Sequence, residues 1–140
     1  MFNPTRDQAR QFLFGAWRKH RDGALQTPLE SLAVQLIERH PEFHDVLGNP
    51  EQYQDKDYLP EYGAVNPFLH LMMHLSIEEQ LSIGQPRGIR SHYQRLTPRF
   101  NSEHHAQHAM MECLGEMLWQ AQRNGTAPDA AVYFACLEKI

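Results

Sequence analysis

The sequence predicts an all-α fold, a compact single-domain bundle of about five to six helices. Apolar residues recur three and four positions apart in several stretches, which is the period of a helix with one buried face. Asparagine or threonine followed by proline, a pair typical of helix starts, precedes three of these stretches. No alternating apolar and polar run predicts a strand. A length of 140 residues suits one domain, so we expect residues 1–140 to form a single helical domain.

Two helices are expected in the first third of the chain. Asn3–Pro4 is predicted to open a helix that continues to about Arg21. Thr27 and Glu30 have the spacing of a capping box, in which the side chain of each residue binds the backbone N–H of the other. This box predicts the start of a second helix, which should end near His40 because a proline follows.

The remaining helices follow a long irregular segment. Residues 41–47 are expected to add a short helical turn, and residues 49–65 lose the helical period and gather tyrosine, proline and glycine. Loops of this length are either functional covers or packed surface segments, and the sequence does not choose between these two interpretations. Four further helices are predicted, over about residues 67–84, 89–96, 103–124 and 129–140.

Charge and hydropathy patterns argue against several classes of protein. The formal charge of -4, without a block of lysine or arginine, argues against a nucleic acid or an anionic membrane as a partner. No stretch approaches the roughly 18 apolar residues of a membrane span. Residues 1–10 are too polar for a secretory signal, so we expect a cytoplasmic protein. Cys113 and Cys136 lie far apart within apolar patterns and are expected to be reduced core residues.

The histidines are concentrated on two of the predicted helices. Residues four apart lie on one face of a helix, so two rows of chemically useful side chains are expected. One row is His70, His74 and Glu78, and the other is His104, His108, Glu112 and Glu116. If the helix over 89–96 reverses the chain, the helices on either side run parallel and bring the two rows to the same end. The sequence then predicts a metal site built from His70, His74, His104 and His108.

Such a site would favour nitrogen-binding metals, and zinc or iron is the expected ion. An open coordination position would activate water for hydrolysis, with Glu112 or Glu78 as the general base or a further ligand. Two metals with mixed histidine and carboxylate ligands would instead suit oxygen or redox chemistry. The sequence leaves both chemistries and the substrate open.

A non-enzymatic protein is the competing interpretation. In it, His70 and His74 are core histidines with structural hydrogen bonds, and the row from His104 is a solvated helix flank. The chain would then be a helical interaction module with a protein partner or a second copy of itself. Three loop tyrosines are candidate anchors for such a partner: Tyr53, Tyr58 and Tyr62. Four other histidines have no matching row, and helix-end or surface positions are expected for His20, His40, His44 and His92.

Several sequence runs resemble one known family. They are Asn66–His70, His74 with Ile77–Gln80, Pro86–Ile89, Met111–Glu116 and Trp119–Gln122. These runs resemble a bacterial domain-of-unknown-function family, family 1841, over most of the chain. The resemblance implies a small bacterial cytoplasmic protein. It supplies no catalytic residues to carry over.

Overall fold

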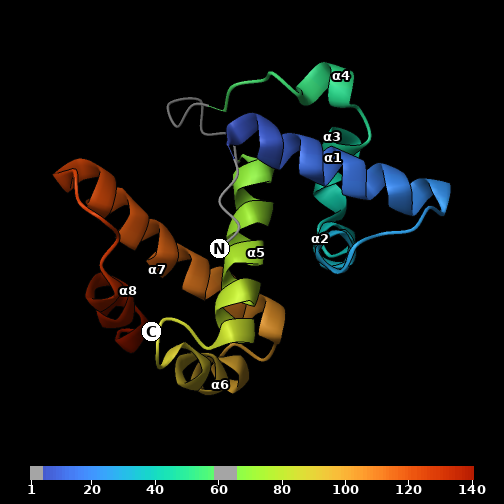
Figure 1. The fold of residues 1–140 in the computed structure, drawn as a ribbon. Coiled ribbons are helices and arrows are strands. Elements are labelled where there is room, and N and C mark those ends of the chain that lie inside the picture. The colour runs from blue at the N-terminus through green and yellow to red at the C-terminus, as the bar shows by residue number, and fades with distance from the viewer. Residues whose placement is uncertain (1–4, 59–65) are drawn as a thin grey trace. The chain divides into compact units, whose positions relative to one another are not determined.

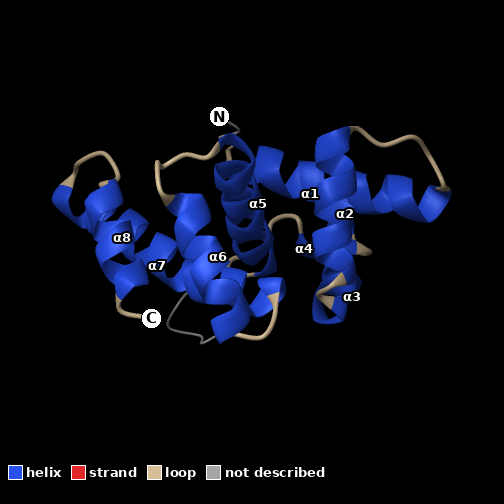
Figure 2. Cartoon of the chain, turned by 90° about the horizontal axis from the view of Figure 1, so that it is seen from below, coloured by secondary structure: helices blue, strands red, loops and turns tan. Residues whose placement is uncertain are grey.

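The computed structural model describes residues 5–58 and 66–140, and every regular element in these ranges is helical (Figures 1 and 2). The all-α prediction is therefore confirmed. The described residues form eight α-helices and one 3₁₀ helix, η1, rather than five to six helices. Their bounds are α1 Arg6–Asp22, α2 Pro28–Glu38, η1 Pro41–Phe43, α3 His44–Leu47, α4 Pro50–Tyr53, α5 Pro67–Ile83, α6 Ile89–Arg99, α7 Glu103–Asn124 and α8 Ala130–Glu138.

The chain divides into two compact units, Met1–Leu75 and Ser76–Ile140, and the division falls within α5. In the N-terminal unit, α1 packs on α2 and α3, and α2 packs on η1. In the C-terminal unit, α7 packs on both α6 and α8. None of the described helices has the length and apolarity needed to span a bilayer.

Local capping explains where the first two helices begin. Thr5 caps α1 by accepting a hydrogen bond from the backbone N–H of Gln8, and the Asn3–Pro4 start lies outside the described residues. Thr27 and Glu30 form the predicted capping box at α2. Helix α2 ends at Glu38, slightly earlier than predicted. The strongest local signals thus set the helix starts.

Residues 49–65, predicted to be irregular, contain a short helix, α4. Arg10, only 2% exposed, holds this segment against α1 by donating from Nη1 to the backbone carbonyls of Tyr53 (3.2 Å) and Gln54 (2.7 Å). The Arg10 guanidinium also lies 4.5 Å from the ring centroid of Phe68 at the start of α5. A buried guanidinium requires such partners, so Arg10 joins three segments of the N-terminal unit.

In the C-terminal unit the ends of α7 are as predicted, whereas α6 is longer than predicted and α8 ends at Glu138 rather than at residue 140. Ser102 caps α7 by accepting from the backbone N–H of His105, and Gly125 ends α7 in a left-handed conformation with φ 63°. Helix α6 continues past Leu96, through Pro98, to Arg99. Pro98 lacks the backbone N–H that would bond to the carbonyl four residues earlier, and α6 ends one residue later, at Arg99.

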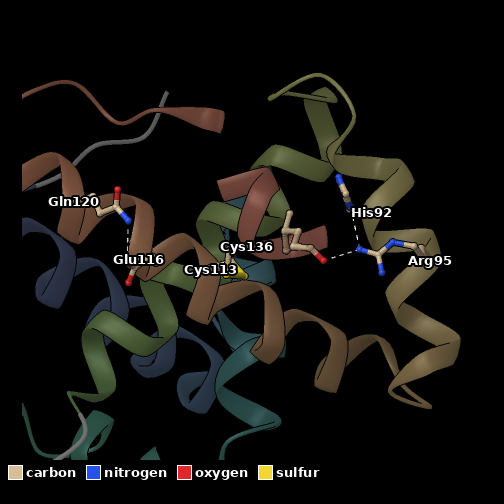
Figure 3. The surroundings of a disulfide bond; sticks show 7 residues. His92, Arg95, Cys113, Glu116, Gln120 and Cys136 are labelled. Carbon is tan, nitrogen blue, oxygen red and sulfur yellow. Dashed lines mark hydrogen bonds between the residues drawn. A yellow bond between two sulfur atoms is a disulfide. The ribbon is translucent and has the colours of Figure 1, made fainter. Parts of the chain in front are cut away.

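The prediction that Cys113 and Cys136 are reduced is wrong, because they form a disulfide between α7 and α8 (Figure 3). Their Cα atoms are 5.5 Å apart, a separation that a disulfide can span. The apolar pattern correctly predicted burial of Cys113, but it carries no information about which two helices pack together. Near this bond, Arg95 of α6 donates to the carbonyls of Leu137 and Ile140 and closes the end of α8.

Candidate metal-binding histidines

His40 follows the last turn of α2 and is only 2% exposed. Its Nδ1 lies 2.7 Å from the backbone carbonyl oxygen of Leu36. A carbonyl oxygen can only accept, so Nδ1 carries a proton, and in the neutral imidazole Nε2 then carries the lone pair. The end of α2 therefore fixes both the tautomer and the orientation of this ring.

The Nε2 side of His40 faces two histidines of α5. Its Nε2 lies 3.0 Å from Nε2 of His70, and its ring centroid lies 4.9 Å from that of His74. His74 is fully buried and His70 is half-buried. The ring centroids of His70 and His74 are 5.0 Å apart, as expected for residues four positions apart on one helix face. The N-terminal unit thus contains a compact group of three imidazoles.

The expectation of a helix-end or surface position for His40 held only in part. His40 is at a helix end, but it is buried and belongs to the histidine group. Helical spacing could not reveal this, because His70 lies 30 residues further along the chain. His44 lies beside the same helix end, where its Nε2 donates to the carbonyl of Ile37 and its ring packs on Trp17.

The second histidine group lies in the first turns of α7. The ring centroids of His104 and His108 are 4.2 Å apart, and both side chains are half-buried. The ring of the exposed His105 lies farther away, with its centroid 6.2 Å from that of His104 and 6.5 Å from that of His108. Helical geometry therefore pairs His104 with His108 and turns His105 elsewhere.

The predicted carboxylates have different surroundings. Glu78 is half-buried, and its Oε1 accepts a 2.6 Å hydrogen bond from Nε2 of the buried Gln107 on α7. Glu112 is exposed. Glu116 is exposed too and accepts from Nε2 of Gln120 (Figure 3). Of these groups, only Glu78 has a carboxylate oriented by a buried partner.

Each histidine pair has the nitrogen donors that a transition metal requires. One ring nitrogen of His40 lies within 4.8 Å of one of His74, and the same holds for His104 and His108. A metal-binding histidine commonly donates its other N–H to a carbonyl, as His40 does to Leu36. These imidazoles could hold a metal ion, and their donor atoms suit zinc or iron better than magnesium or calcium.

The candidate anchor tyrosines of the loop are partly engaged by the N-terminal unit. Tyr53 donates from its hydroxyl to the carboxylate of Asp45, and this hydrogen bond raises the pKa of the Tyr53 phenol. The ring of Tyr58 lies against Phe68, and burial raises the pKa of its hydroxyl. Tyr62 lies outside the described residues. The contacts of Tyr53 and Tyr58 indicate packing rather than free anchors.

Neither a curated protein nor a solved structure matches the chain with significant similarity. One family does match, and it covers nearly the whole chain, including both histidine groups. The chain belongs to the family described as Domain of unknown function (DUF1841), which matches residues 5–139.

Proposed function

We propose that this chain is a metal-binding protein in which His40 with His74, and His104 with His108, are ligands of a divalent transition-metal ion. Zinc or iron is the ion we expect. The orientation of His40 is the observation that carries the proposal. The His40 ring is buried, and its Nδ1–H donates to a carbonyl at the end of α2. Its Nε2 therefore faces the other imidazoles, so the ring is already oriented as a metal ligand.

Coordination number sets what else a bound ion needs. Two imidazoles fill only half of the four positions that zinc uses in closed protein sites. Each pair is compact within its own unit, so an ion bound by one pair would need further ligands, such as water or another side chain.

His70 has a separate role in this proposal. Its Nε2 approaches the lone pair of His40 that the ion needs, so without metal the two rings share a hydrogen bond. Binding of the ion breaks that hydrogen bond and leaves His70 as a neighbouring nitrogen that can replace another ligand. The ligand set suggested by sequence, with His70 instead of His40, is therefore revised rather than abandoned.

Catalysis would require an open position on the ion. Exchange of one imidazole for water would supply it, and hydrolysis or redox chemistry would then follow from the metal and the substrate. Glu78 suits the general base better than Glu112, because Gln107 orients its half-buried carboxylate. The metal-binding role itself does not depend on such a reaction.

The metal content of protein purified without an affinity tag tests this proposal. The chain should bind Zn²⁺ or Co²⁺, measured by elemental analysis after equilibrium dialysis. His74→Phe should lower the metal content, and so should the double change His104→Gln with His108→Gln. His105→Gln is the matched control, because this exposed neighbour should be dispensable.

Two results would contradict the proposal in different ways. Wild-type protein that stays metal-free after dialysis against Zn²⁺ and Co²⁺ would leave the helical interaction module as the better interpretation. Metal retained at the wild-type level by either variant would show that the altered pair is not a metal ligand.

A further inference from the structure

A separate cavity lies in the N-terminal unit between α1 and the segment from α3 to α4. Its volume is about 710 Å³, within the range of small-molecule sites. Phe14, Trp17 and Leu47 line it with apolar surface. A second hollow, of about 720 Å³, shares Trp17, Arg21 and Gly48 with the first. We call the first space the Trp17 cavity.

Two cations, Arg18 and Arg21, line the Trp17 cavity. Among the described residues, Arg18 and Arg21 make neither a hydrogen bond nor an ion pair. Their neighbour Lys19 differs, because its Nζ binds Glu30 at 2.8 Å. One carboxylate, that of the exposed Asp22, also lines the cavity, so its wall carries a net positive charge.

The nearest acid of the second hollow does not neutralise these arginines. The carboxylate of Asp45 accepts hydrogen bonds from Asn49 and from the hydroxyl of Tyr53. The guanidinium of Arg21 lies against Gly48 instead, where an added Cβ would come within 3.1 Å of its Nη1. The absence of a side chain at residue 48 therefore gives Arg21 its place in the wall.

Gly15 is the second observation that points to a ligand. It lies in the middle of α1, where glycine is less favourable than alanine by about 1 kcal/mol. Packing does not require it, because a Cβ built at residue 15 meets no atom within 4 Å. This open space belongs to the Trp17 cavity, so Gly15 widens the cavity at the expense of helix stability.

We propose that the Trp17 cavity binds a small organic anion, a phosphate or carboxylate group carried on a flat apolar body. Arg18 and Arg21 bind the anionic group. Phe14, Trp17 and Leu47 contact the apolar body, and Gly15 leaves it room against the α1 backbone. The site is independent of the histidine pairs, because neither hollow is lined by His40, His70 or His74.

Tryptophan fluorescence of the full chain tests this site. Trp119→Phe, a change at a 53% exposed position of α7, leaves Trp17 as the reporter. Phenyl phosphate and benzoate are titrated as the two kinds of anion. Two compounds serve as controls: inorganic phosphate lacks the apolar ring, and benzyl alcohol lacks the anionic group. A saturable change in Trp17 fluorescence is expected with phenyl phosphate or benzoate at millimolar concentration or below, and no such change is expected with either control.

Variants then assign the binding to the cavity. Arg21→Gln should weaken binding at least tenfold, because a charge-assisted hydrogen bond is lost. Arg39→Gln, at an exposed position of the same unit outside the cavity, should not change it. Gly15→Leu should abolish binding by filling the space. If the leucine variant does not fold, Gly15→Ala should fold at least as stably as wild type and still bind more weakly.

The proposal is overturned by the absence of saturable binding of both phenyl phosphate and benzoate. Equal affinity of wild type and Arg21→Gln would overturn it as well, as would unaltered binding in a folded Gly15→Leu or Gly15→Ala variant. Tight binding of benzyl alcohol would show that the cavity recognises apolar groups rather than anions.

Discussion

His40 combines two functions that mutation can separate. Its Nδ1–H closes the end of α2 through the carbonyl of Leu36, and its Nε2 is the proposed metal ligand. Asparagine places an amide N–H close to the position of Nδ1 but has nothing in place of Nε2. His40→Asn should therefore retain the cap and lose the metal, whereas His40→Ala should lose both.

The size of each effect follows from the burial of the ring. His40 is 2% exposed and stacks on Phe43, so His40→Ala should lower the free energy of unfolding by about 3–5 kcal/mol, as other buried ring truncations do. His40→Asn keeps the hydrogen bond to Leu36 and should lose about 1–2 kcal/mol. For a chain of this length, each kcal/mol lowers Tm by roughly 4 °C.

Thermal unfolding with and without Zn²⁺ measures both effects. Zn²⁺ at a hundredfold excess over Kd should stabilise the wild type by about 2.7 kcal/mol, or roughly 10 °C in Tm. The same Zn²⁺ concentration should raise Tm of His40→Asn less than that of the wild type. The reasoning is refuted if the asparagine variant gains as much stability from Zn²⁺ as wild type. It is refuted too if metal-free His40→Asn is as unstable as His40→Ala, because the cap would then contribute nothing.

Three further predictions concern the stability of the two units. Replacing Cys113 and Cys136 with serine should lower the free energy of unfolding by about 3 kcal/mol, since their bond closes a 23-residue separation, and thiol titration of the unreduced wild type should find no free cysteine. The hydrogen bond from Lys19 holds the pKa of Glu30 below its ordinary value of 4.5. Glu30 should therefore stabilise the fold above that pH and lose this effect as the pH falls through the lowered pKa. Glu30→Gln should accordingly reduce the loss of stability on the acid side of a stability-against-pH curve. An unchanged acid side of the curve would contradict this. Arg10→Lys should lower the free energy of unfolding by about 1–3 kcal/mol in denaturant titrations, because a single ammonium cannot replace the planar guanidinium at two carbonyls and a ring. A change within experimental error would contradict the proposal that Arg10 joins three segments of the N-terminal unit.

The helices were predictable where short-range chemistry decides them. The capping box of Thr27 and Glu30 and the cap at Ser102 involve residues three apart, so the sequence displays them directly. The four-residue helices α3 and α4 were not identified as separate helices, because four residues span little more than one turn and show no period. The increase from the six helices predicted individually to eight comes from these two.

The candidate site was only half predictable for a related reason. The pairs His70–His74 and His104–His108 follow from the helical repeat. His40 does not, because its burial depends on packing of the α2 end against the distant α5. The disulfide was missed on the same ground, since its formation requires α7 and α8 to lie together.

X-ray absorption at the zinc edge of the metal-loaded protein tests histidine ligation most directly. The proposal predicts a first shell that contains nitrogen neighbours at roughly 2.0–2.1 Å, with the outer-shell scattering of imidazole rings. His74→Phe combined with His104→Gln and His108→Gln should remove this signal together with the bound zinc. A first shell of oxygen without imidazole scattering would contradict metal binding by the histidine pairs.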